Sequence, residues 1–332
     1  MQKKFVQNVL FKIFIFIGLI LPSSIYSSEK NINNKNIYYL VSDIRIPFWD
    51  IMARGASAKA KELGYELTVL SANNSAKKEL QNTVAAMKNK ASAIVLSPTN
   101  SSAAVTILKF AKDANIPVVI SDIGADSDGY VSFISSNNEQ GAYDLGKILT
   151  HELNKRGWQK GTVGIISIPQ KRANGKARTR GFMRALEEAG IKSSNLYQQV
   201  DFSYKETYDF SIKLIKKDPN LRAIWLQGSD RYKGALDAID KSGKTGDILL
   251  ICFDAEPIFL DLIQKGILVA AGMQQPYLMG EKAVVTLDRH LNSLHVAHKQ
   301  QLPVLAISKE NIKEELGLIK RNVLGLNSKV GK

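Results

Sequence analysis

The feature that most constrains the fold is a unit that recurs along the chain: a short apolar run, a polar turn and an amphipathic helix. The first unit runs from the apolar stretch Ile37–Ser42 to a helical pattern over Phe48–Leu63. The apolar runs are nearly continuous instead of alternating with polar residues, which is typical of parallel strands covered by helices on both faces. The repeated order of strand and helix therefore predicts an α/β protein.

Apolar runs of four to seven residues mark the expected strands. The strands are predicted at Ile37–Ser42, Glu66–Ser71, Ala93–Ser97, Val118–Ser121, Thr162–Ile168, Leu196–Phe202, Ala223–Leu226, Leu249–Phe253 and Leu268–Met273. Helical periodicity and end signals mark the helices. The helices are predicted at Phe48–Leu63, Ala76–Lys90, Ser101–Ala114, Asn137–Arg156, Lys176–Ala189, Tyr204–Lys217, Asp230–Lys241 and Pro276–Leu291.

This number of strands would make one unusually wide sheet, so two sheets in two lobes fit better. The segment Asp126–Ser136 is the expected first crossing between them, because a new α/β unit opens at Ser136. Capping-box patterns at Ser136–Glu139 and Ser203–Glu206 predict helix starts there. Two such lobes facing each other form a ligand cleft that closes by hinging.

The first 28 residues have the pattern of a secretory signal. Lys3 and Lys4 supply the positive start, Ile13–Leu21 is a short apolar core, and small residues favour cleavage near Ser24–Ser28. An uncleaved anchor is the alternative, and no cysteine follows the core for a lipid anchor. We therefore expect a periplasmic protein.

The formal net charge is +14, and the chain has a single cysteine, Cys252. Export and the scatter of lysines over helix faces favour a solvated surface over nucleic-acid binding. One cysteine excludes an intramolecular disulfide and a thiolate metal site. Cys252 lies in an apolar run, where packing is its expected role.

Aromatic, acidic, amide and guanidinium side chains gather at or just beyond the predicted strand ends. Carboxylates accept from hydroxyl groups, guanidinium groups donate in a planar fork, and aromatic faces pack on the less polar faces of a sugar ring. The set therefore suits a polyhydroxylated ligand. The candidate ligand-binding residues are Arg45, Phe48, Trp49, Asp122, Arg178, Arg180, Phe202, Asp230, Asp254 and Gln274.

Each candidate also has a plainer interpretation. The carboxylates fit helix caps or loop ion pairs equally well, and Phe48 and Trp49 could simply pack beneath the first helix. Only one of Arg178 and Arg180 should face the cleft, because side chains two apart on a helix diverge. The basic loop Lys171–Lys176 could attract an anion, although a solvated loop is our expectation.

Nothing in the sequence pairs a nucleophile with a base. His290, His295 and His298 are close in sequence, but their spacing does not place them on one helical face. We therefore expect no enzyme activity, no catalytic residue, no cofactor and no bound metal.

With these residues the chain resembles the periplasmic sugar-binding proteins of the ribose-binding type, which share their core with the LacI-type repressors. The resemblance rests on Ile46–Trp49, Ala58–Tyr65, Leu96–Asn100, Ala114–Val119, Ala177–Phe182, Gly234–Leu236, Phe253–Asp254 and Met273–Pro276. It implies the type I periplasmic binding fold, in which two Rossmann-like lobes with parallel sheets are joined by a three-strand hinge. The implied boundaries are 36–136 plus 275–303 for lobe 1 and 137–274 plus 304–326 for lobe 2, after the signal peptide at 1–28.

The resemblance also assigns roles to several of the candidates. The family's stacking aromatics fall on Phe48, Trp49 and Phe202, and its remaining ligand-binding positions fall on Asp122, Arg180 (with Arg178 as the near competitor), Asp254 and Gln274. Where the ribose-type pattern has Asn before Pro47, this chain has Ile46, with Arg45 beside it. It also has Ile123 where the pattern has Arg, so ribose is not the expected ligand.

The resemblance therefore implies a periplasmic solute-binding protein that captures a sugar-like molecule for an inner-membrane ABC permease. The alternative is an autoinducer-type receptor that signals to a membrane sensor kinase or chemoreceptor. Either protein is expected to be a monomer that does not bind nucleic acid. An exported enzyme acting on a small polar substrate is the third and least favoured hypothesis.

Overall fold

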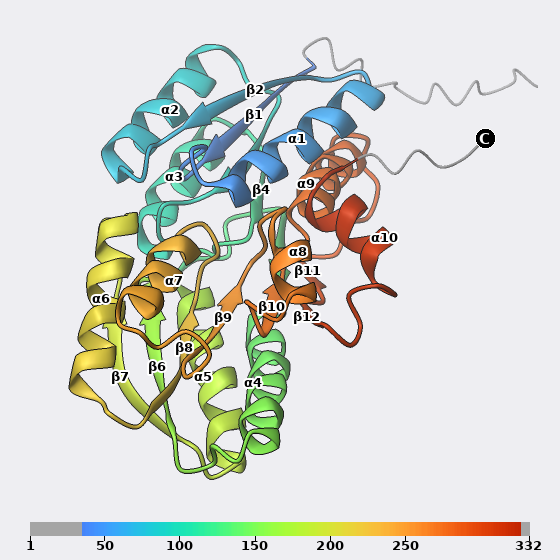
Figure 1. The fold of residues 1–332 in the computed structure, drawn as a ribbon. Coiled ribbons are helices and arrows are strands. Elements are labelled where there is room, and N and C mark those ends of the chain that lie inside the picture. Colours follow the sequence, from blue (N-terminus) through green and yellow to red (C-terminus); the bar gives the residue numbers. More distant parts are fainter. Residues whose placement is uncertain (1–34, 327–332) are drawn as a thin grey trace, which may run out of the picture. The chain divides into compact units, whose positions relative to one another are not determined.

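The structure is a computed structural model that describes residues 35–326, so the predicted signal at residues 1–28 lies outside the described residues. The chain forms two six-stranded sheets with helices packed against them (Figure 1). Both sheets are dominated by parallel pairs, which confirms the predicted α/β fold class. Within residues 35–326, no helix combines the length and apolarity needed to cross a membrane.

The first sheet is parallel throughout, in the order β11-β5-β4-β3-β1-β2. We call the part of the chain built on it the first lobe. Its central strands β3 and β4 are buried along their whole length, as their continuous apolar sequences predict. The strands are β1 (Asn36–Val41), β2 (Glu66–Ser71), β3 (Ala93–Ser97), β4 (Val118–Ser121), β5 (Ser132–Ser136) and β11 (Lys299–Leu302).

The second sheet, on which the second lobe is built, has the order β12-β10-β9-β8-β6-β7. Its strands pair in parallel except for β12, which runs antiparallel to β10 at one edge. The strands are β6 (Thr162–Ser167), β7 (Lys192–Gln198), β8 (Leu221–Leu226), β9 (Leu249–Phe253), β10 (Ala270–Met273) and β12 (Leu305–Ser308).

Within the described residues the chain passes between the two sheets three times: after β5, after β10 and after β11. This is the predicted three-strand connection. The prediction that Asp126–Ser136 makes the first crossing was wrong, because Ser132–Ser136 is strand β5 of the first sheet. The crossing follows directly after Ser136.

Helices cover both faces of each sheet, and their apolar faces complete the cores. Tyr38 and Tyr39 on β1 show the pattern, since the two neighbours belong to separate apolar clusters of the first lobe. The helices are α1 (Pro47–Glu62), α2 (Ala76–Lys88), α3 (Ser101–Asp113), α4 (Asn138–Lys155), α5 (Ala173–Glu188), α6 (Tyr204–Lys217), α7 (Tyr232–Lys241), α8 (Phe259–Gln264), α9 (Pro276–Leu291) and α10 (Leu316–Leu318), which continues into a π-helical turn at Ile319–Val323.

Two local predictions need correction. The predicted strand Leu196–Phe202 lies earlier, as β7 at Lys192–Gln198. Helix α4 is capped by Asn137, whose side chain accepts from the backbone N–H of Gln140, and not by Ser136. The other predicted cap is confirmed, because Ser203 accepts from the backbone N–H of Glu206 at the start of α6.

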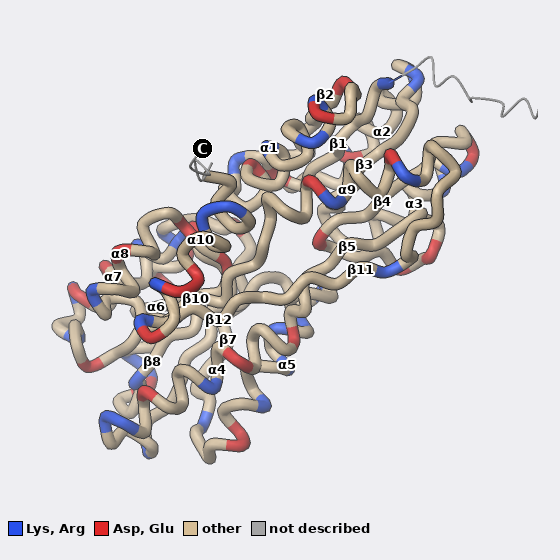
Figure 2. Tube along the Cα trace, turned by 90° about the vertical axis from the view of Figure 1, so that its right-hand side faces the viewer, with Lys and Arg blue, Asp and Glu red and all other residues tan. Residues whose placement is uncertain are grey.

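The surface charges agree with the interpretation of the net charge. Figure 2 shows Lys and Arg interspersed with Asp and Glu along the described helices, without a continuous basic stripe. Several exposed pairs are one helical turn apart, such as Lys109 with Asp113 and Lys205 with Asp209. Such pairs add little stability and mainly keep the surface hydrated.

Helices α1 and α9 approach each other closely through glycine. A Cβ atom added at Gly280 of α9 would lie 2.1 Å from the carbonyl oxygen of Met52 on α1. The same atom would lie 2.7 Å from the backbone nitrogen of Ala56. These neighbours are backbone atoms and cannot rotate away, so the two helices would have to move apart.

Substituting Gly280→Ala should therefore lower the free energy of unfolding by about 2 kcal/mol, the usual cost of overpacking. Urea unfolding followed by circular dichroism measures this change. Gly317→Ala is the matched control, because a Cβ atom at that helical position meets nothing within 4 Å. The control should be neutral or stabilising by up to about 1 kcal/mol. Equal effects of the two substitutions would contradict the close approach of α1 and α9.

Candidate functional site

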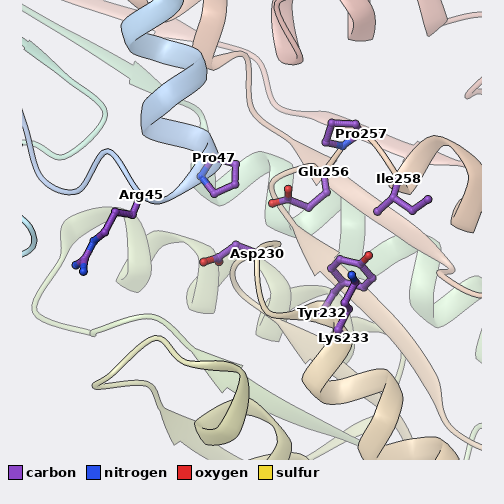
Figure 3. A pocket seen from close by; sticks show the side chains of 8 residues that line it. All are labelled: Arg45, Pro47, Asp230, Tyr232, Lys233, Glu256, Pro257 and Ile258. Carbon is purple, nitrogen blue, oxygen red and sulfur yellow. The ribbon is translucent and has the colours of Figure 1, made fainter. Parts of the chain in front are cut away.

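Two neighbouring cavities are lined by residues of both lobes, and together we call them the cleft. One, of about 650 Å³, lies between the start of α1 and the loops that follow β8 and β9 (Figure 3). The other, of about 540 Å³, shares Arg45 and Asp230 with the first. In Figure 3, Asp230 and Glu256 point into the space beside Pro47, whereas the Arg45 guanidinium points away. The cleft lies beyond the strand ends, where ligands of open α/β sheets bind.

Arg178 connects three segments of the second lobe at their ends. Its Nε donates to Asn138 Oδ1 at 2.8 Å, and its Nη1 donates to the carbonyl oxygen of Gln227 at 2.8 Å. Nη1 also lies 3.5 Å from Asp254 Oδ2, and the guanidinium stacks 4.0 Å from the ring centre of Phe253. Its side chain is only 3% exposed. Helix α4, strand β8 and strand β9 therefore share one buried cation.

Arg180 lies elsewhere. Its side chain is 62% exposed and pairs with Glu139 of α4, with Nη2 2.7 Å from Oε2. It lines a separate cavity of about 280 Å³ that also includes Asp122 and Asn174. Of the two arginines left open by the sequence, Arg178 is thus the one that contacts another candidate residue, Asp254.

Asp254 and Gln274 lie together at the ends of neighbouring strands β9 and β10. Gln274 Nε2 donates to Asp254 Oδ1 at 2.5 Å, and Arg178 approaches the other carboxylate oxygen. Gln274 is buried, and its Oε1 has no hydrogen-bond partner among the described residues. The fold therefore brings Arg178, Asp254 and Gln274, which are distant in the sequence, into contact.

Asp122 occupies the corresponding strand end of the first lobe, after β4. Its Oδ2 lies 3.5 Å from Asn174 Nδ2 of α5, across the lobes, while its buried Oδ1 has no hydrogen-bond partner among the described residues. Burial raises the pKa of Asp122 to about 6, although Arg178 opposes the shift. The buried Asp122 carboxyl therefore needs a hydrogen-bond donor that the described residues do not supply to Oδ1.

Three of the candidate residues have left-handed backbone conformations that residues other than glycine rarely adopt: Asp122 (φ 71°), Asp254 (φ 67°) and Phe202 (φ 52°). Asp122 and Asp254 each donate their backbone N–H to a neighbouring strand, to Ile134 and Gly272 respectively. Such strained residues concentrate at functional sites, where the surrounding structure holds them in place.

The aromatic candidates are placed differently from one another. Trp49 is buried in the core of the first lobe, and Phe48 packs edge-on against it with ring centres 5.0 Å apart. Phe202 lies at the cleft with the guanidinium groups of Arg231 and Arg172 at 4.9 and 5.6 Å from its ring centre. Of the three rings, Phe202 is the one that lines the cleft cavity shared with Arg45.

The remaining candidates form ion pairs with sequence neighbours. Arg45 donates to both carboxylate oxygens of Asp43, and these bonds hold the pKa of Asp43 below its usual value despite burial. Arg231 donates to Asp230 and to the carbonyl oxygen of Phe202. Burial nevertheless raises the pKa of Asp230 to about 6. Both pairs line the cleft with largely compensated charge.

Several cleft residues were missed in the sequence. Glu256 lies two residues beyond Asp254, accepts a hydrogen bond from Ser229 at 2.7 Å, and has its pKa raised by burial to about 7. Glu256 could have been predicted from the sequence, because it lies just beyond the end of a predicted strand. Arg172 lies just before α5, and only the tertiary fold brings it to the cleft, whereas Asn138 and Asn174 line the separate cavity beside Arg180.

The unpaired atoms indicate what the site can bind. Three buried oxygens at strand ends, Asp122 Oδ1, Gln227 Oε1 and Gln274 Oε1, are acceptors without a partner among the described residues. Buried acceptors are costly unless a donor satisfies them. Among residues 35–326, no cluster of three or more acidic, histidine or cysteine side chains could hold a metal ion. The arrangement therefore suits reversible binding of a ligand with several hydroxyl groups.

Two lobes on parallel sheets, three chain crossings and a polar cleft at the strand ends define a type I periplasmic solute-binding fold. The comparison with family models agrees: residues 37–294 match the periplasmic binding protein domain, and the chain belongs to this family. This is a family of solute-binding proteins, as the sequence predicted, and not of enzymes.

Individual relatives support this assignment. The chain is 30% identical to the ribose import binding protein of Escherichia coli, over 82% of this chain and 90% of the relative. It is 28% identical to the D-apiose import binding protein of Actinobacillus succinogenes, over 81% and 86%. A carbohydrate transporter solute-binding protein from Agrobacterium radiobacter, solved with D-arabinose, has the same fold (TM-score 0.80, 22% identity, 87% of this chain and 99% of that one).

The raised pKa of Glu256 predicts how stability depends on pH. The folded protein binds this proton more tightly than the unfolded chain, whose glutamate titrates near 4.5. The contribution to stability is complete below pH 4.5 and is lost as the pH rises through about 7. Asp122 and Asp230 act in the same direction between 3.8 and about 6. The free energy of unfolding should therefore fall between pH 4.5 and 7.5.

Replacing Glu256→Gln should reduce this fall by on the order of 2 kcal/mol, because the amide keeps an acceptor for Ser229 and carries no charge. Urea unfolding at several pH values measures the effect. Glu66→Gln, at an exposed position of β2, is the control that removes a carboxylate far from the cleft. Parallel pH profiles for the wild type and the Glu256 variant would show that this carboxyl is not buried as described.

Proposed function

We propose that this protein is a periplasmic solute-binding protein that captures a sugar-like molecule in the cleft and delivers it to an inner-membrane ABC permease. The observation that carries the proposal is the convergence of Asp122, Arg178, Asp254 and Gln274, with unpaired acceptors, in a member of this family. The relatives are named as import proteins, which favours delivery to a permease over signalling to a sensor kinase.

In this proposal the lobes comprise residues 36–136 plus 275–303 and residues 137–274 plus 304–326, and the protein acts as a monomer. Asp122 belongs to the first lobe, whereas Arg178, Asp254 and Gln274 contact the ligand from the second. A ligand that bonds to both lobes stabilises the closed arrangement, because only that arrangement makes all its contacts. Closure, and not covalent chemistry, is then what the permease detects.

A thermal-shift screen over pentoses, hexoses, sugar acids, sugar phosphates and polyols should identify at least one stabilising compound. For that compound, Asp254→Asn should weaken binding by at least about thirtyfold in calorimetry. The substitution keeps the shape of the side chain but removes the charge that faces Arg178 and the ligand hydroxyls. The Asp254 side chain is 15% exposed, so it is not fully buried in the core.

Arg180→Gln is the matched control, since it removes a charge on the same lobe from an exposed side chain and should leave affinity within about twofold. The proposal fails if no compound stabilises the protein and native mass spectrometry detects no co-purified ligand. Equal loss of affinity in both variants would instead contradict the assignment of Arg178 over Arg180.

We further propose that residues 1–28 are an export signal that is cleaved near Ser24–Ser28. The motifs that support this are Lys3 and Lys4 ahead of the apolar core Ile13–Leu21. The full-length chain, expressed in a Gram-negative host, should appear in the periplasmic fraction with a mass that corresponds to a start within a few residues of Glu29. Retention of the first 28 residues in membranes would indicate an uncleaved anchor instead.

A further inference from the structure

Three arginines line the cleft, and two of them contact a carboxylate. Arg45 pairs with Asp43, and Arg231 pairs with Asp230. The third, Arg172, has no carboxylate oxygen within 4.0 Å among the described residues. It is therefore the cleft guanidinium whose charge no contacting acid compensates.

No carboxylate of the described residues contacts Arg172, although Asp43, Asp201 and Asp230 line the same 540 Å³ cavity and Asp126 lines the adjoining one. Arg172 is half-buried just before α5, and its Nη2 donates to Asn74 Oδ1 of the first lobe at 3.3 Å. Its guanidinium lies over Phe202, beside which Arg231 also packs. Burial lowers the pKa of Arg172, and attraction to Asp122 and Glu79 beyond contact distance opposes the shift. Among the described residues, only one of the five guanidinium N–H donors of Arg172 makes a hydrogen bond, so the other donors are available to a ligand.

Arg172 also lines both the 540 Å³ cavity of the cleft and an adjoining cavity of about 290 Å³. The adjoining cavity is lined further by Lys171, by Asn100, Thr99 and Asp126 of the first lobe, and by Gln199 of the second. With Arg172, two cations and one acid therefore line this cavity, together with amide and hydroxyl groups from both lobes. A half-buried guanidinium is costly without a counter-charge, and its planar fork matches a carboxylate or phosphate group.

We propose that the ligand carries an anionic oxygen group, a carboxylate or a phosphate ester, which Arg172 binds beside Phe202. This inference rests on the proposed function and narrows its substrate class from sugars in general to acidic or phosphorylated sugars. The polyhydroxyl part lies toward Asp254 and Gln274, whose acceptors take hydroxyl donors. The anionic group bridges Arg172 to the amides of the first lobe and contributes to closure.

The test uses matched compounds on the mature protein: one neutral aldose, its aldonic acid and its terminal phosphate ester, for one pentose and one hexose. Calorimetry should show at least about tenfold tighter binding of one anionic form than of its neutral parent. Arg172→Gln should remove that preference while leaving the weaker affinity for the neutral parent within about threefold. Which form is preferred, the acid or the phosphate ester, identifies the anionic group.

Lys176→Gln is the control, because it removes one positive charge from an exposed position of α5 and should preserve the preference. Asn74→Ala breaks the same bond between the lobes as Arg172→Gln but keeps the guanidinium, so it should preserve the preference for the anionic compound. The inference is overturned if the neutral parents bind as tightly as their anionic forms, or if the preference survives Arg172→Gln. Either result would leave the proposed sugar-binding function intact. If neither the neutral nor the anionic compounds bind, the proposed function is contradicted as well.

Discussion

The arrangement of the cleft depends on one buried cation, Arg178. Its guanidinium holds the start of α4, the end of β8 and the end of β9 in fixed relation through Asn138, the Gln227 carbonyl and Asp254. Without Arg178, the Asp254 carboxylate and the Gln227 carbonyl oxygen would lose a buried hydrogen-bond donor. The cost of leaving such acceptors unpaired exceeds the net stabilisation that the contacts provide. The site on the second lobe is thus arranged around the Arg178 guanidinium, whose charge Asp254 compensates.

Strain at the strand ends completes the arrangement. Asp122 and Asp254 both turn into the left-handed region directly after a strand, and both give their backbone N–H to a neighbouring strand. Asparagine and aspartate tolerate this conformation better than most residues, and the hydrogen bonds offset part of its cost.

The repeat of apolar run and helix was sufficient to predict most of the fold. Three strands escaped prediction: β5, β11 and β12 are four or five residues long, and β5 and β11 are largely polar, as in Lys299–Leu302. Edge strand β7 was misplaced because Lys192–Gln198 is mostly exposed. Strands that are short, polar or exposed are fixed by the neighbour with which they pair, and a local pattern does not carry that information.

For the candidate site, sequence reasoning found the strand-end residues but not the balance of charge among them. The basic loop that begins at Lys171 was interpreted as solvated, and locally that interpretation is reasonable. Arg172 becomes half-buried only because Phe202, thirty residues later, and Asn74, from the first lobe, approach it in the fold. Glu256 likewise acquires its raised pKa from burial beside Asp230 and Asp254. In our proposal the ligand faces the unpaired guanidinium of Arg172 on one side and carboxyl groups on the other. It therefore needs an anionic group at one end and hydroxyl donors at the other. The positions of these protein charges follow from packing in the fold.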